Sequence, residues 1–320
     1  MTILEDADSS SNIDPVAELL PALKKSSSGV QGVEPWKTQI QEPTNFRHIK
    51  KDGNPDTNLD LCWAHGYHSE GRNNVRYIMS EKSPYPHLVV YPTASLIVVY
   101  DTNTKEQSFY QGHICEVTCL AIHPNGQVVA SGDVSCNVQI WDTTSLQCLR
   151  SIKGLVKQGI QHISFSPITG DRIATVGLDS DHTIALYDSS TGEIMGSSKG
   201  FSHPNNVLAM AFATSGNEIV IVGRKQIKFF RNINSVQRAL TGVNGKIGKA
   251  GKKQTFFCVA YFGDDAIVGC GNGELYRFKG EQMVQAVQAH TMNEPVLSIC
   301  CNHGDFVMVT GCKDGIVKTW

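Results

Sequence analysis

A histidine, a threonine, an aspartate and a tryptophan near the end of the chain have types and spacings that could do chemistry. A hydroxyl next to a His–Asp pair has the composition of a nucleophilic triad, in which the base takes the hydroxyl proton and the acid orients the base. The same groups can instead hydrogen-bond to one another and tie neighbouring strands together. No nucleophile-elbow sequence of the form Gly-x-Ser-x-Gly surrounds the threonine, which favours the structural role. The four residues are His290, Thr310, Asp314 and Trp320.

Four lysines lie within one glycine-rich run, Gly245–Lys253. The run lacks the GxxxxGK[ST] spacing of a phosphate-binding loop, so we expect no nucleotide and no other cofactor. Two interpretations stay open: a solvated loop between strands, or a cationic patch that binds an acidic protein partner. The four side chains are Lys246, Lys249, Lys252 and Lys253.

Histidine and cysteine are the other residue types that could hold a metal. Five histidines gather between residues 65 and 123, but nothing in their spacing places two of them on one face beside a carboxylate or thiolate. The ten cysteines include no Cys-x-x-Cys pair, and most lie in apolar, strand-like runs. We therefore expect no metal and no disulfide, but free thiols in a reducing compartment.

Composition excludes several classes of partner. Hydrophobic residues make up 41% of the chain, charged residues only 18%, and the formal net charge is −2. So small a charge gives no global field for nucleic acid or an anionic membrane. The start of the chain is acidic and lacks the apolar core of a secretory signal, and no apolar run is long enough to predict a membrane span.

The elements that must position these residues are short strands. From about residue 57 onward, short apolar runs alternate with turn residues, which is typical of an all-β chain. Six runs end in an aromatic residue, and successive aromatics are 41, 46, 43, 48 and 42 residues apart. A period of about 40–45 residues with four short strands per unit is that of a propeller blade. The six aromatics are Tyr100, Trp141, Tyr187, Phe230, Phe278 and Trp320.

The period and the Trp141-Asp142 dipeptide predict an all-β, WD-repeat β-propeller with about six blade units. Residues 1–55, rich in serine and proline with weak hydrophobic periodicity, are predicted to be disordered. Residues 56–101 form a divergent first blade, and residues 102–320 hold five WD-type repeats. In such a blade the histidine, hydroxyl, turn aspartate and tryptophan form a buried hydrogen-bonded network. The last repeat is predicted to carry it complete, with no catalytic role for its histidine and aspartate.

Three segments of the predicted first blade carry a resemblance. Leu61–Tyr67, Gly71–Asn74 and Ala94–Tyr100 resemble the HELP motif of the echinoderm microtubule-associated-protein-like family. Downstream segments, among them Tyr110–His113 and Lys313–Val317, resemble the first propeller of the same family. The resemblance covers about residues 57–320.

The resemblance implies a tandem pair of propellers that scaffolds protein assemblies and binds tubulin or microtubules, in the cytoplasm on the cytoskeleton or in the cilium. Family members that bind microtubules strongly often have a trimerising coiled coil and a basic linker, and neither pattern is present in this sequence. The family pattern also predicts a seventh blade and a second propeller beyond Trp320.

Two functions remain open at this stage. One is a non-enzymatic scaffold that binds tubulin or microtubules, as the resemblance implies. The other is a general protein–protein adaptor, for example in a ciliary or signalling complex. An enzyme is disfavoured, because no paired acids, metal ligands or activated nucleophile converge in the sequence. Fold alone does not separate these classes.

Overall fold

The chain folds into antiparallel sheets joined by short turns. A computed structural model describes residues 60–67, 69, 71–72, 74–78, 87–202, 206–231, 233, 240–249, 251–302 and 306–320. Asp60–Trp320 is one compact unit. The segment predicted to be disordered, residues 1–55, lies outside the described residues. No helix occurs among the described residues, and hence none with the length and hydropathy to cross a bilayer.

The strands form six sheets, each with its strands paired in chain order. The first sheet holds β1 (Arg76–Tyr77), β2 (Leu88–Thr93), β3 (Leu96–Asp101) and β4 (Gln107–Tyr110). The second holds β5 (Val117–Ile122), β6 (Val128–Asp133), β7 (Asn137–Asp142) and β8 (Cys148–Lys153). The third holds β9 (Ile160–Phe165), β10 (Arg172–Gly177), β11 (Ile184–Asp188) and β12 (Ile194–Ser198).

The remaining three sheets continue the pattern. The fourth holds β13 (Val207–Phe212), β14 (Ile219–Gly223), β15 (Gln226–Arg231) and β16 (Thr241–Asn244). The fifth holds β17 (Phe256–Phe262), β18 (Asp265–Cys270), β19 (Glu274–Lys279) and β20 (Gln282–Gln288). The sixth is three-stranded among the described residues, with β21 (Val296–Asn302), β22 (Val307–Cys312) and β23 (Val317–Thr319).

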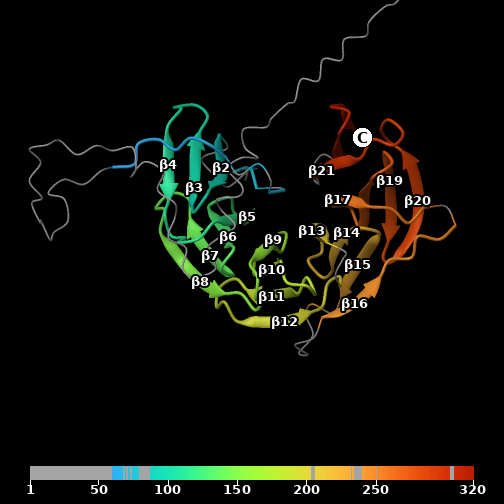
Figure 1. Ribbon diagram of the computed structural model, residues 1–320, viewed down its shortest axis with the longest axis horizontal. Coiled ribbons are helices and arrows are strands. Elements are labelled where there is room, and N and C mark those ends of the chain that lie inside the picture. Colours follow the sequence, from blue (N-terminus) through green and yellow to red (C-terminus); the bar gives the residue numbers. More distant parts are fainter. Residues whose placement is uncertain are drawn as a thin grey trace, which may run out of the picture. The chain divides into compact units, whose positions relative to one another are not determined.

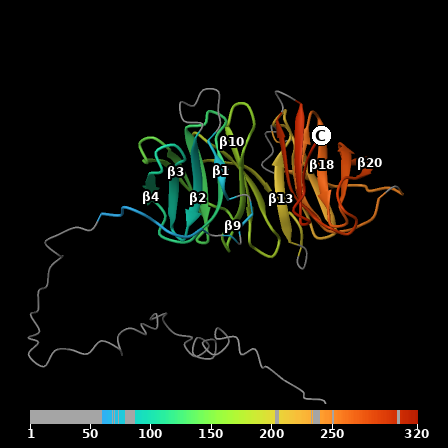
Figure 2. The ribbon, with the colours of Figure 1, turned by 90° about the horizontal axis from the view of Figure 1, so that it is seen from above.

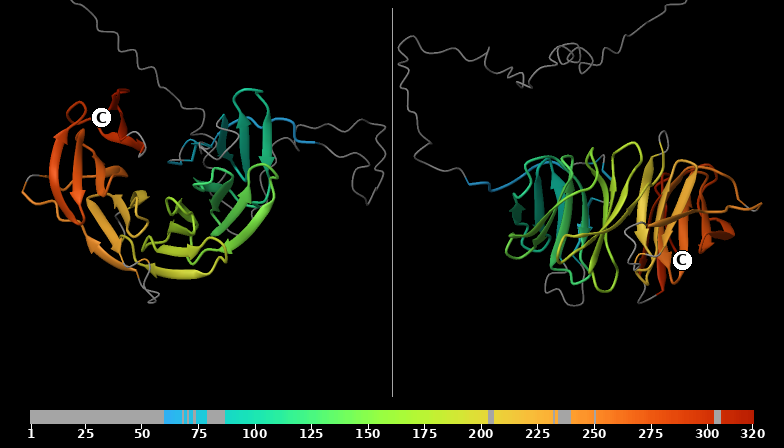
Figure 3. Two further views of the ribbon diagram at one scale, coloured as in Figure 1. Left: turned by 180° about the vertical axis from the view of Figure 1, so that it is seen from behind. Right: turned by 90° about the horizontal axis from the view of Figure 1, so that it is seen from below.

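The sheets follow one another around a common centre, as propeller blades do (Figure 1). The first strands of the second to sixth sheets, β5, β9, β13, β17 and β21, face that centre, and the fourth strands lie outside. Seen from the side, the blades stand next to one another with their strands upright (Figures 2 and 3). The predicted all-β propeller with six blade units is confirmed.

The hydrophobic core lies between neighbouring blades and not inside a single sheet. Each of the five buried clusters draws its residues from two consecutive sheets. A central strand such as β10 is therefore buried at every position, because both of its faces meet another blade. This explains why the strands have continuous apolar runs and not a strict alternation.

The first sheet differs from the predicted blade boundary. Its fourth strand, β4, begins at Gln107 and pairs with β3. The boundary placed after residue 101 therefore falls between the third and fourth strands of one sheet. The period was counted from aromatics: five of the six stand on the third strand of their blade, and Trp320 directly follows β23.

Candidate partner-binding surfaces

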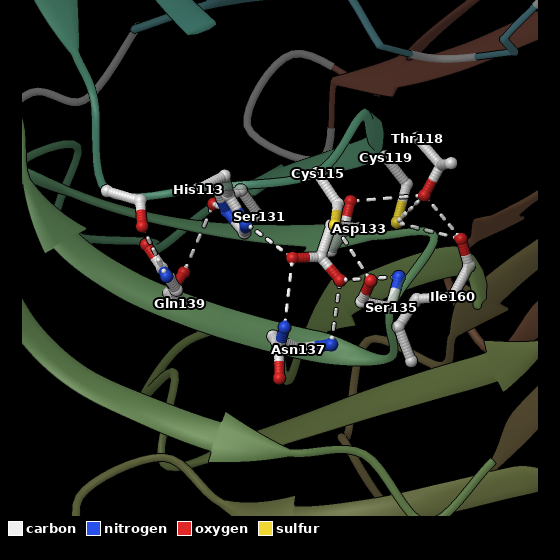
Figure 4. Close-up of polar contacts among 12 residues, drawn as sticks. His113, Cys115, Thr118, Cys119, Ser131, Asp133, Ser135, Asn137, Gln139 and Ile160 are labelled. Carbon is white, nitrogen blue, oxygen red and sulfur yellow. Dashed lines mark hydrogen bonds and ion pairs between the residues drawn. The ribbon is translucent and has the colours of Figure 1, made fainter. Parts of the chain in front are cut away.

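The second blade holds a chain of hydrogen bonds among an aspartate, a histidine and a serine (Figure 4). The Nδ1 atom of His113 is 2.9 Å from Asp133 Oδ2, and its Nε2 atom is 2.6 Å from Ser131 Oγ. Trp141 Nε1 donates to the same serine oxygen at 3.3 Å. Asp133 also accepts from the backbone N–H groups of Ser135 and Asn137 in the turn before β7. The chain thus connects the turn, β6, β7 and the loop before β5.

This arrangement has the connectivity of a nucleophilic triad, but the hydroxyl is not accessible. Ser131 and Trp141 are fully buried, and His113 and Asp133 are nearly so. The Trp141 ring stacks on Tyr110 of the first blade at 4.4 Å between centroids, which closes that side. Burial lowers the pKa of His113 despite the carboxylate of Asp133, so the ring is neutral at pH 7. A neutral, buried network of this kind holds strands together.

The last blade brings together three of the four residues predicted there. His290 Nε2 is 2.8 Å from Thr310 Oγ1, and Trp320 Nε1 donates to that same oxygen at 2.9 Å. Asp314 does not join them: its carboxylate accepts from Thr291 Oγ1 at 2.8 Å and from the Ile316 N–H at 2.9 Å. Asp314 is partly exposed and Trp320 is 43% exposed, which differs from the buried four-residue network expected from the sequence.

The physical reason is the spacing between the hydroxyl residue and the aspartate: Asp314 lies two positions further along the chain from Thr310 than Asp133 lies from Ser131. Asp133 follows Ser131 by two residues on β6, and the residue in the same place after Thr310 is Cys312. The Nδ1 atom of His290 therefore has no hydrogen-bond partner among the described residues. The full network lies in the second blade, and the signal for it was Ser131-Gly-Asp133 in a repeat whose turn position holds Ser135.

One group of side chains in the described residues has a composition that could hold a metal. His290, Cys312 and Asp314 offer ligand atoms within 4.8 Å of one another. Burial raises the pKa of the Cys312 thiol, so a metal ion would have to displace the thiol proton in order to bind the sulfur.

The four predicted lysines form one strip, which we call the lysine strip, between the fourth and fifth blades. All four side chains are exposed. The backbone beneath them is fixed: Lys246 N–H donates to Glu281 O at 2.7 Å, and Lys252 N–H donates to Tyr276 Oη at 2.8 Å. Met283 N–H donates back to Lys246 O at 3.0 Å. The backbone of the described lysines is therefore tied to the fifth blade at Lys246 and at Lys252.

A second cationic region lies at the centre of the blades. A cavity of about 330 Å3 is lined by Arg72 and by residues of the inner strands β5, β9 and β13. Arg72 Nη1 donates to Phe257 O on β17 at 3.2 Å, and its guanidinium carbon lies 5.2 Å from the centre of the Phe257 ring. Arg72 belongs to the segment Gly71–Asn74, which the sequence singled out for its resemblance to the HELP motif but not as a site residue. The inner strands contain no acidic residue that would pair with it.

The segment before β1 also exposes large apolar side chains. It is held to the first sheet by Gln107, whose side chain exchanges two hydrogen bonds with the backbone of Ala64. Exposed aromatic residues of this kind are typical anchors of protein interfaces. The exposed residues are Leu61, Trp63, Tyr67 and Val75 before β1, and Tyr77 on β1.

Comparison with known proteins identifies the propeller. Residues 106–320 match the family described as the echinoderm microtubule-associated protein first beta-propeller. The chain belongs to this family. It is 25% identical over 279 residues to the 77 kDa echinoderm microtubule-associated protein of Lytechinus variegatus. It is 26% identical over 282 residues to echinoderm microtubule-associated protein-like 2 of Mus musculus, and 26% over 281 residues to echinoderm microtubule-associated protein-like 1 of Homo sapiens.

Membership of the echinoderm microtubule-associated protein family covers most of the chain but only part of each relative. The three alignments span 83% of this chain, and 40%, 42% and 33% of the respective relatives. The chain thus spans less than half the length of these curated relatives. The family match itself covers residues 106–320, which include the lysine strip; Arg72 and the exposed apolar residues before β2 lie outside it.

Proposed function

We propose that this chain is a non-enzymatic scaffold that binds microtubules or tubulin in the cytoplasm, on the cytoskeleton. The observation that carries the proposal is the match of residues 106–320 to a propeller family whose relatives are named as microtubule-associated proteins. The segment that resembles the HELP motif and the WD-type repeats would together supply the surface. Among the described residues, the lysine strip is the surface that would contribute to this binding.

The lysine strip is the surface that we assign to an acidic partner. Its four ammonium groups are exposed, and its backbone is already ordered by hydrogen bonds to Glu281 and Tyr276. A pre-ordered surface loses less conformational entropy on binding than a flexible loop. Contacts between exposed charges weaken with salt, so an electrostatic contribution from this strip has a measurable signature.

Co-pelleting of the purified chain with polymerised tubulin over a salt titration tests the proposal. The variant in which Lys246, Lys249, Lys252 and Lys253 are changed to Gln should pellet about tenfold more weakly at low salt, and its salt dependence should flatten. Its melting temperature should stay near that of the parent, since the four side chains are exposed.

A matched control removes the same number of charges elsewhere. It changes four other exposed lysines to Gln, and it should pellet as the parent does. These lysines are Lys105, Lys153, Lys157 and Lys313. Equal loss in both variants would assign the effect to net charge. A folded parent chain that does not pellet at low salt would overturn microtubule binding and leave the general protein–protein adaptor as the function.

A further inference from the structure

Two arginines near the centre of the blades have no carboxylate partner among the described residues. Arg72 lies in the segment before β1, and Arg76 is the first residue of β1. The inner strands that face them, β5, β9, β13, β17 and β21, contain no aspartate and no glutamate. Cations at a hollow whose walls carry no counter-charge raise the local positive potential, because low-dielectric walls focus the field.

The two arginines line two hollows that share strand β9. Arg72 lines the central cavity with Gln161 and His162 of that strand. Arg76 lines a neighbouring hollow, also of about 330 Å3, with Ser164 and Ser166. The hollows thus follow consecutive residues of one extended strand, and an extended peptide laid beside β9 would pass both guanidinium groups.

Three buried polar atoms at this place have no hydrogen-bond partner among the described residues. They are Arg76 Nε, Gln161 Oε1 and His162 Nε2. The amide N–H of Gln161 donates to Val207 O at 3.0 Å, and the amide oxygen of Gln161 is left as an acceptor without a donor. Buried polar groups without partners are costly, which marks them as the places where a ligand would bond.

The mixture of unsatisfied groups distinguishes between ligands. A guanidinium N–H forms its strongest hydrogen bonds with a carboxylate or another oxyanion. The bare amide oxygen of Gln161, in the central cavity with Arg72, would repel an anion such as phosphate but would accept a backbone N–H. The apolar wall formed by Leu178, Val207 and Leu208 suits carbon atoms. A peptide with acidic side chains offers all three: carboxylates, backbone N–H groups and methylene stems.

We propose that these two hollows bind an extended acidic peptide segment of a partner protein, with carboxylates on Arg72 and Arg76. Arg72 is already positioned for this role by its hydrogen bond to Phe257 O and its contact with the Phe257 ring. His162 stays neutral at pH 7, because burial and the two nearby arginines lower its pKa to about 4, and it acts only through hydrogen bonds. The site is separate from the lysine strip and does not depend on microtubule binding.

Fluorescence anisotropy with a fluorescein-labelled hexaglutamate peptide at low salt tests the proposal. The measurements use the chain in which the four lysines of the lysine strip are already Gln, so that binding reports the central site. Arg72→Gln and Arg76→Gln should each weaken binding about tenfold, the loss expected for one charge-assisted hydrogen bond. Arg72 is exposed, so its variant should fold even where that of the half-buried Arg76 does not.

Arg150→Gln is the matched control. Arg150 lies on the outer strand β8 and, like Arg72, donates to a backbone carbonyl, that of Thr191 at 3.0 Å. It removes the same charge and should change the peptide affinity by less than about twofold. Peptide affinity in a folded Arg72→Gln chain equal to that of the parent would overturn the proposal.

Two further probes test the chemistry of the ligand. A hexaglutamine peptide should bind at least about tenfold more weakly than hexaglutamate, and equal binding would overturn the role of the carboxylates. Millimolar inorganic phosphate should displace little of the peptide. Complete displacement by phosphate at constant ionic strength would overturn the peptide assignment and make this a simple anion site.

Discussion

Ser131 Oγ stands between two ring nitrogens, those of His113 and Trp141, and both rings are buried. The same hydroxyl–histidine–tryptophan contact recurs in the last blade at Thr310, but there Trp320 is 43% exposed. Water can replace a lost hydrogen bond only where it has access. Two chemically similar networks should therefore contribute different free energies of folding.

Ser131→Ala should destabilise the chain by about 1–3 kcal/mol, because it leaves two buried ring nitrogens without a partner. Urea unfolding followed by circular dichroism measures this. Thr310→Ala is the matched comparison and should cost less, since Trp320 is 43% exposed and only His290 of its two ring partners is buried. A loss below about 0.5 kcal/mol for Ser131→Ala would show that the second-blade network is not formed in solution.

His162 should make stability depend on pH. Burial, with Arg72 and Arg76, lowers its pKa in the folded chain to about 4, below the ordinary histidine value of about 6.5. Between these values the unfolded chain binds a proton that the folded chain rejects, so stability falls as the pH drops from about 6.5 towards 4. At pH 5 His162→Gln should recover about 1–2 kcal/mol of the parent's loss. Parallel stability curves for the two proteins would contradict this.

At the scale of elements, each blade from the second to the sixth has an irregular pairing between its first two strands. The register shifts once in every such pair, for example between Phe256 and Cys258 opposite the end of β18. A glycine stands on the second strand at this place, and a side chain there would meet atoms of the same or the next blade. The bulge bends the inner strand, and the glycine lets neighbouring blades approach. The five glycines are Gly132, Gly177, Gly223, Gly269 and Gly311.

Gly269→Ala tests this role of the glycines. The added Cβ would lie 2.4 Å from Cys258 Sγ in the fifth blade and 3.0 Å from Val296 Cβ in the sixth, so both side chains must shift. We expect a loss of about 1–3 kcal/mol in the free energy of unfolding, the usual cost of overpacking a core. Gly271→Ala is the control, because its nearest atoms are at 3.4 Å, an ordinary contact. Equal stability of the two variants would contradict close packing at Gly269.

At the scale of the whole molecule, the core is a series of contacts between successive blades. Such an arrangement opens locally where a blade is least covered. The sixth sheet is the least covered, since every residue of β23 is exposed. The free cysteines report on this opening because they are spread over the blades: Cys62, Cys148 and Cys300 are exposed, and Cys119, Cys136, Cys258, Cys270 and Cys312 are buried.

Alkylation of the native chain with iodoacetamide, read by peptide mass spectrometry, should modify Cys62, Cys148 and Cys300 first. Burial raises the pKa values of Cys119 and Cys258 to about 12, so these thiols should react only after their blades open. Among the buried thiols, Cys312 of the sixth sheet should react earliest. Labelling of Cys119 before Cys312 would contradict this order of opening.

The sequence by itself determined the class of fold and the number of blade units. Aromatic residues such as Trp141 and Phe278 recur at the blade period because each blade repeats the same local strand pattern and the same contact with its neighbour. Strand pairing in chain order follows from short turns, which are a local property. The lysines of the lysine strip were visible for the same reason, since they lie within one short run.

Only the tertiary structure decided which polar residues meet. The network of His113 required knowing that Asp133, and not a residue at the turn position of Ser135, points back to the ring. The central site joins Arg72 to Phe257, which is 185 residues away along the chain. A hydrogen bond reaches about 3 Å, and sequence spacing fixes positions within a blade but not which side chains meet between blades at that distance.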